Sequence, residues 1–149
     1  MTVLESETTT SSAVRRDPRV VLQSVWIFTM LNYLYCDVLG FMVAEDLQGF
    51  LDGNVGGLEI TPMFLLGAGM LMEIPIAMVL VSRLAPHKVA RIASIAAGAF
   101  MALVQVGSVG IGSDLTVHYA FFSVVEIAAT VFIVRFAWKW RPVPAVRQA

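Results

Sequence analysis

Four long apolar segments are the feature that most constrains how this chain folds. They cover residues 20–43, 61–84, 89–112 and 116–140, and each has about the 20 residues that a helix needs to cross a ~30 Å hydrocarbon core. Lipid offers backbone N–H and C=O groups no hydrogen-bond partner, so a crossing segment has to be helical or part of a closed barrel. These runs lack the alternation of barrel strands. The sequence therefore predicts an all-α fold, an integral membrane bundle of four transmembrane helices over residues 20–141.

Composition supports this prediction, because 58% of the 149 residues are hydrophobic and only 14% are charged. A soluble domain has about 25% charged residues. Residues 1–19 are polar, rich in Thr and Ser, and contain no apolar run that could order them. They predict a disordered cytoplasmic tail, retained because it lacks the apolar region of a secretory signal. Residues 142–149 predict a second, shorter cytoplasmic tail.

Charge is segregated between the two sides of the predicted bundle. All ten Lys and Arg residues fall on one side when the four segments alternate in direction, and the connections on the other side are acidic. By the positive-inside rule, both termini are expected in the cytoplasm. Three tryptophans near the basic side are expected to anchor the helices at the interface: Trp26, Trp138 and Trp140.

The longest connection, residues 44–60, carries apolar residues at helical spacing opposite acidic ones. It predicts either a short amphipathic helix on the outer leaflet or an acidic solvated loop. A turn is expected at the Gly56-Gly57 pair. Thr61 is then the expected N-cap of the second long helix, with Pro62 at its first position.

Two acidic residues lie near the middle of predicted spans, Glu73 in the second and Glu126 in the fourth. An ionised residue at that depth costs about 2.5–3.5 kcal/mol on insertion scales, so such a carboxyl normally faces the bundle interior, a cavity or a partner. The sequence therefore points to a proton or cation site. The alternative is that both carboxyls are protonated and only bond across the bundle. Pro75 removes an N–H from its helix, so it predicts a kink and a free carbonyl one turn earlier, at Leu71.

The first segment adds a polar face that includes Asn32, Tyr33 and Asp37. Asp37 lies in the outer third, where it serves either as the entrance of a path toward the two glutamates or as a boundary acid. Asn32 is most simply an interhelical hydrogen-bonding residue. Gln105, in the third segment, is expected to bond to a carboxyl of the second or fourth helix or to act in packing only.

The third segment repeats a small residue every four positions, at Ala90, Ser94, Gly98 and Ala102. Such a seam lets another helix backbone approach closely, either inside the bundle or between two copies of the chain. No spacing of His, Cys, Asp or Glu indicates a metal site, and no motif indicates a cofactor or a nucleic acid.

Several stretches carry a family resemblance. The motif Asn-Tyr-Leu-Tyr-x-Asp is matched at residues 32–37, and Met-Glu-Ile-Pro-Ile-Ala-Met at residues 72–78. With the stretch FFSVVEIAATVFIVRFAWKW at residues 121–140, the chain resembles a family of small bacterial four-helix integral membrane proteins of unknown function. The resemblance covers about residues 20–141. It implies a bacterial cytoplasmic membrane setting, and it implies no activity and no functional residues.

Three functions are compatible with these features. The first is an oligomeric membrane protein whose buried acids bind or move protons, a cation or a small lipophilic cation. The second is an accessory or scaffold subunit, in which the acids bond to a partner's membrane helix. The third, a lipid-modifying enzyme with the two carboxyls as general acid and base, has only the acids in its favour. Enzymatic activity is therefore not the expectation.

Overall fold

The computed structural model describes residues 17–55, 57–109 and 116–141. Apart from one small hairpin and the short connections these residues are helical, which confirms the all-α prediction. The elements are α2 (Pro18–Gly40), α3 (Ala44–Leu51), β1 (Asn54–Val55), β2 (Leu58–Glu59), α4 (Pro62–Leu84), α5 (His87–Val109) and α6 (Val117–Lys139). Most of the predicted N-terminal tail (1–16), the predicted C-terminal tail (142–149) and the predicted last turn of the third segment (110–112) lie outside the described residues.

Three helices, α4, α5 and α6, are each long and apolar enough to cross a membrane. The helix α2 meets the same criterion only together with α3, to which it is joined at a bend of 87°. The polar residues Gln23, Asn32 and Asp37 make α2 the least apolar of the four long helices. The described residues therefore contain three candidate spans, or four when the bent pair counts as one.

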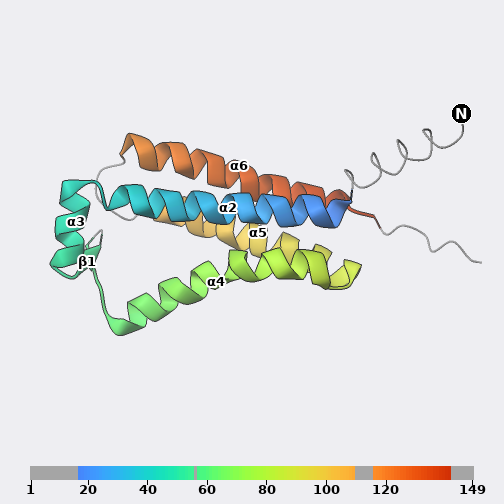
Figure 1. The fold of residues 1–149 in the computed structure, drawn as a ribbon, viewed down its shortest axis with the longest axis horizontal. Helices are drawn as coiled ribbons and strands as arrows, with labels where there is room; N and C mark the ends of the chain where they lie inside the picture. The colour runs from blue at the N-terminus through green and yellow to red at the C-terminus, as the bar shows by residue number, and fades with distance from the viewer. Residues whose placement is uncertain (1–16, 56, 110–115, 142–149) are drawn as a thin grey trace, which may run out of the picture.

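The four long helices run antiparallel in chain order (Figure 1). The helix α2 packs against α4 and α6, and α5 packs against the same two helices. In this four-sided arrangement α4 and α6 lie diagonally opposite each other. One cluster of buried side chains fills the end at which α2 begins and α6 ends, and it consists of Leu22, Trp26, Met78, Ala90, Ile133, Ala137 and Trp140.

The two ends of the bundle differ in charge. We call the end formed by the start of α2, the α4–α5 connection and the end of α6 the basic end, because all Lys and Arg residues of the described ranges lie there or within about one turn of it. The opposite end, with α3 and the hairpin, carries Glu45, Asp46, Asp52 and Glu59 and is called the acidic end. The segregation seen in the sequence is thus a property of the folded chain.

Trp26 corrects one expectation from the sequence. Its side chain is fully buried in the cluster at the basic end, so it does not anchor the helix at an interface. Leu22, Trp26, Thr29, Tyr33 and Cys36 are spaced by three and four residues and form the buried stripe of α2. Trp138 is 67% exposed at the end of α6, whereas Trp140 is buried in the same cluster as Trp26 and does not fit the expected interfacial role either.

The connection between α2 and α4 holds both a short helix and an unexpected hairpin. The helix α3 places Glu45 and Asp46 in its first turn, where the helix dipole favours negative charge. The strands pair antiparallel, with Asn54 opposite Glu59, and Gly57 has a φ of +84° in the turn between them.

The N–H of Phe64 donates to Oγ1 of Thr61 at 3.1 Å and Pro62 is the first residue of α4, as the sequence predicts.

Pro75 lies inside α4, and α4 leans away from the other helices toward its N-terminal end (Figure 1). A proline in a helix removes one hydrogen bond and its ring clashes with the preceding turn, which bends the helix. Residues 65–70, before the bend, are all exposed, whereas Met78 and Ser82, after it, are buried. The bend thus divides α4 into an unpacked half and a packed half.

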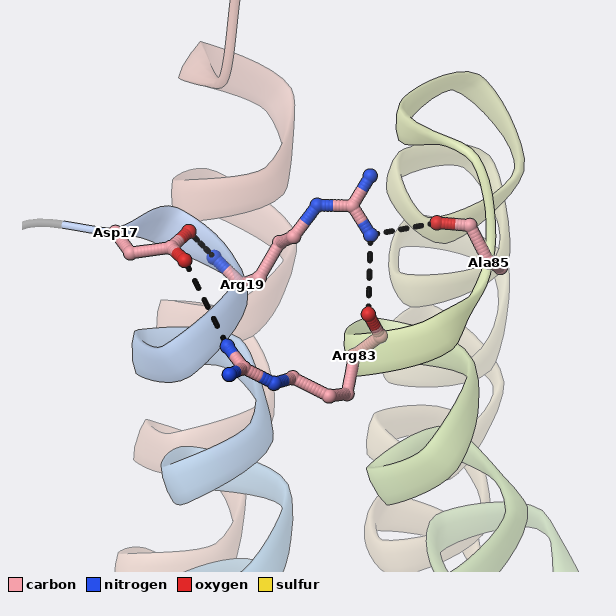
Figure 2. Close-up of polar contacts among 4 residues, drawn as sticks. All are labelled: Asp17, Arg19, Arg83 and Ala85. Carbon is pink, nitrogen blue, oxygen red and sulfur yellow. Dashed lines mark hydrogen bonds and ion pairs between the residues drawn. The ribbon is translucent and has the colours of Figure 1, made fainter.

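Polar contacts join the start of α2 to the end of α4 (Figure 2). Nη1 of Arg19 donates to the carbonyls of Arg83 at 3.1 Å and Ala85 at 2.6 Å, which satisfies acceptors that a helix C-terminus leaves open. Oδ1 of Asp17 accepts from the Arg19 N–H at 2.9 Å and caps α2, and its Oδ2 lies 3.6 Å from Nη1 of Arg83. The prediction of a disordered tail up to residue 19 is therefore wrong for residues 17–19, because these contacts order them.

Candidate functional site around Glu126

Glu126 is the acid that the fold buries. Its side chain is 1% exposed, on the stripe of α6 that faces the bundle interior and also contains Ser123, Ala129, Thr130 and Ile133. At ~1.5 Å per residue it lies about 20 Å along α6 from the basic end, near the middle of the helix. Its Oε1 atom has no hydrogen-bond partner among the described residues.

The helix α2 packs against α6, and residues of its polar face lie within electrostatic range of Glu126. The carboxyl lies close enough to Tyr33, Cys36 and Asp37 to interact electrostatically with all three. Tyr33 and Cys36 are buried, and the Tyr33 hydroxyl also has no hydrogen-bond partner among the described residues. Asp37 is exposed, and it lies one turn nearer to the acidic end than Tyr33. We call Glu126, Tyr33, Cys36 and Asp37 the Glu126 cluster.

Gln105 of α5 approaches the same level from the other side. It is buried, and its Nε2 donates to Oγ of Ser123 at 2.9 Å, one turn from Glu126 on α6. One turn further along α5, the hydroxyls of Ser108 and Tyr119 lie 2.8 Å apart. The predicted contact of Gln105 with a carboxyl is therefore replaced by a bond to a hydroxyl. These two pairs tie α5 to α6 beside the Glu126 cluster.

Asn32 corrects a second expectation. Its Nδ2 donates to the carbonyl of Phe28 at 2.8 Å within α2, so the bond is not interhelical. A polar side chain in an apolar helix readily bonds the carbonyl one turn before it, and Thr29 does the same with Val25 at 2.9 Å. Asn32 is half-buried and outside the Glu126 cluster.

Glu73 corrects the central expectation, that both mid-helix acids face one interior. Its side chain is exposed on α4, and α4 lies diagonally opposite the helix that carries Glu126. The position of Glu73 on its helix explains the difference, because it lies about 200° around the axis from Pro75, opposite the stripe that α4 buries at Pro75, Met78 and Ser82. The fold therefore does not pair the two carboxyls as an enzymatic acid and base would require.

The seam of small residues on α5 faces α6 inside the chain. Ala90, Ser94 and Gly98 are buried, and Ala102 is half-buried. A β-carbon at Gly98 would meet Val134 and Ile133 of α6. Of the two roles that the sequence left open for this seam, the structure shows the one inside the bundle, so the seam is occupied and does not offer a second copy a free surface.

The chemistry of the Glu126 cluster depends on how the negative charge of a buried carboxylate is neutralised. A carboxylate in an apolar interior is costly unless a cation, a proton or several donors neutralise it. Every Lys and Arg of the described ranges lies toward the basic end, and the ion pair found within those ranges joins Asp17 to Arg83. No group of three or more His, Cys, Asp or Glu residues able to hold a metal occurs there either. A bound proton or cation would neutralise a carboxylate in such surroundings.

Sequence comparison gives one result for this chain. The sequence model of a family, described as "Family of unknown function (DUF6326)", matches residues 13–144. No curated protein and no solved structure matches the chain. The family match includes both motifs at residues 32–37 and 72–78 and covers every element of the fold. The chain therefore belongs to the family of unknown function DUF6326.

Proposed function

We propose that this chain is a multi-pass protein of the bacterial cytoplasmic membrane in which Glu126 binds a proton or a small cation and passes it on as part of an oligomer. In this proposal α2, α4, α5 and α6 cross the membrane and both termini are cytoplasmic, as the positive-inside rule favours. The observation that carries the proposal is the Glu126 carboxyl, 1% exposed with an unpartnered Oε1 among the described residues.

A route to this carboxyl is available along α2. Asp37, Tyr33 and Glu126 lie at increasing depth from the acidic end, and Asp37 is exposed there. At ~1.5 Å per residue, Asp37 lies about 5 Å and Tyr33 about 11 Å from the end of α2. An exposed acid followed by an unpartnered hydroxyl and a buried acid is an arrangement that can hand a proton or a cation inward.

The experiment measures proton flux in proteoliposomes that enclose a pH-sensitive dye. We expect Glu126→Gln to abolish a flux that the wild-type chain supports, because the amide cannot take up or release a proton. Glu59→Gln is the matched control, since Glu59 is an exposed acid of the hairpin, and it should leave the flux unchanged. The same measurement with a sodium or potassium gradient separates proton from cation movement.

Infrared spectroscopy gives an independent readout. A protonated buried carboxyl has a carbonyl band of its own, and we expect this band in the wild-type protein and its loss in Glu126→Gln. If Glu126→Gln removes the band and leaves every measured flux unchanged, Glu126 only bonds within the bundle and the proposal of transport is wrong.

A second candidate function, an accessory subunit, is favoured by Glu73. A carboxyl exposed at mid-helix on a candidate span is expected to bond to a partner's membrane helix. We expect a stoichiometric membrane protein to co-purify with the chain from native membranes, and Glu73→Leu to release it while Glu59→Gln does not. Recovery of the chain without any stoichiometric partner would contradict this function and leave the proposal for Glu126 untouched.

A further inference from the structure

A groove runs along the junction of α2 and α6 from the basic end inward. Its outer part has a volume of about 750 Å³ and is lined by Pro18, Val21, Phe132, Arg135, Phe136, Lys139, Trp140 and Arg141. A second hollow of about 480 Å³ continues it along the same two helices. Phe132 lines both parts.

The two parts of the groove differ in chemistry. The inner part is lined by apolar side chains alone, from Val25 and Phe28 of α2 and from residues 124–132 of α6. The outer part has an apolar floor and a rim of three basic side chains, Arg135, Lys139 and Arg141, with no acid among its lining residues. The groove is therefore apolar toward the middle of the helices and cationic toward the basic end.

In the part of the chain that the structure describes, the cations on this rim lack the contacts that occupy other basic residues. Arg19 bonds two carbonyls at the end of α4, and Arg91 donates to the carbonyls of Ala137 and Trp138 at 3.1 and 3.0 Å. Within the described residues, neither Arg135, Lys139 nor Arg141 forms an ion pair or a side-chain hydrogen bond, and all three are exposed.

The order of side chains on α6 explains how one helix supplies both parts. Phe132, Arg135, Phe136 and Lys139 follow each other at three, one and three residues, so they share one face of the helix. The rings of Phe132 and Phe136 are stacked, with centroids 5.6 Å apart. Opposite them, Pro18, Val21, Val25 and Phe28 repeat at three and four residues along α2. Two stripes thus form the walls of one groove.

We propose that this groove binds a phospholipid with an anionic headgroup, whose phosphate lies at the rim of Arg135, Lys139 and Arg141 and whose acyl chain lies along the apolar part. From Pro18 to Phe28 the wall is about 15 Å long at ~1.5 Å per residue, which is half of a ~30 Å hydrocarbon core and therefore one leaflet. Basic sites between membrane helices on the cytoplasmic side suit anionic headgroups. The inference rests on the membrane placement in the proposed function and is independent of the role of Glu126.

Native mass spectrometry of the detergent-solubilised full chain tests the proposal, with phosphatidylglycerol and phosphatidylcholine of equal acyl length as probes. We expect one phosphatidylglycerol to bind more tightly than any phosphatidylcholine. The triple variant Arg135→Gln, Lys139→Gln and Arg141→Gln should bind it on the order of a hundredfold more weakly, from about fivefold per basic residue. Lys88→Gln, an exposed cation at the start of α5 outside the groove, should bind as the wild type does.

A second variant tests the apolar part separately. Ala128→Phe places a large side chain in the inner hollow and is expected to weaken phosphatidylglycerol binding, whereas Ala96→Phe, at an exposed alanine of α5, is not. Equal affinity for the two lipids, or an unchanged affinity in the triple variant, would show only non-specific lipid contact and overturn the proposal. Competition by glycerol phosphate as effective as by the lipid would overturn the role of the acyl chain. Absence of bound lipid from the full chain would also overturn the proposal.

Discussion

A β-carbon built on Gly98 of α5 would stand 2.9 Å from Cγ2 of Val134 on α6. The two helices can therefore approach as they do only because this position has no side chain. Gly98→Ala is expected to lower the free energy of unfolding by about 1–3 kcal/mol through overpacking, since a β-branched valine in a helix has few other rotamers to adopt. Unfolding of the detergent-solubilised chain by a denaturing detergent measures this change.

Gly67→Ala is the matched control for this prediction. Gly67 lies on the exposed half of α4, and a β-carbon there would meet nothing within 4 Å. The substitution should be neutral or stabilise the protein by up to about 1 kcal/mol, because alanine is the better helix former. Equal destabilisation by the two alanines would refute the close approach of α5 and α6.

The bond between Gln105 and Ser123 predicts an energetic coupling. Gln105→Leu and Ser123→Ala each remove one partner of a buried 2.9 Å hydrogen bond between α5 and α6. We expect a double-mutant cycle to give a coupling of about 0.6 kcal/mol and at most about 1.7 kcal/mol, the average and the maximum found for hydrogen bonds between membrane helices. The cycle uses the same unfolding assay, and strictly additive single effects would show that the two side chains do not interact.

Replacing Pro75 is expected to change the shape of α4 rather than the stability of the protein. Pro75→Ala restores a backbone N–H that can bond the carbonyl of Leu71, so α4 is expected to straighten and its first half to approach the bundle. Spin labels on cysteines at the exposed positions Met63 and Val117, in a Cys36→Ala background, should give a shorter distance in this variant. Labels at Leu84 and Trp138, at the basic end, should keep their distance. An unchanged distance at the acidic end would contradict Pro75 as the cause of the bend in α4.

Arg19 and Arg83 should differ in their effect on stability. Arg19→Gln removes a charged donor from two carbonyls at the end of α4, and bonds to charged groups each contribute about 1.5–3 kcal/mol. Arg83→Gln removes only a 3.6 Å ion pair between side chains that are 49% and 41% exposed, which contributes about 0–1 kcal/mol. Thermal unfolding of the two variants measures both effects, and a larger loss in Arg83→Gln would reverse the assignment.

Local signals in the sequence were enough for the elements of this fold. The long helices, the cap at Thr61, the proline at the start of α4 and the segregation of charge between the ends depend on the residues of each segment and their immediate neighbours. The hairpin after α3 had no comparable signal, because each strand has only two residues and two residues carry no readable alternation.

Only the tertiary structure decided which side of each helix lies inside. Trp26 and Glu126 are buried and Glu73 is exposed, although apolar residues surround all three in the sequence. In a segment that is apolar on every side, hydropathy hardly distinguishes one face of the helix from another, so the neighbouring helices decide which face lies inside. The same holds for two other sets of residues that the sequence shows. The small residues of α5 form a seam only because α5 packs against α6. The basic residues of α6 form the rim of a groove only because α6 packs against α2.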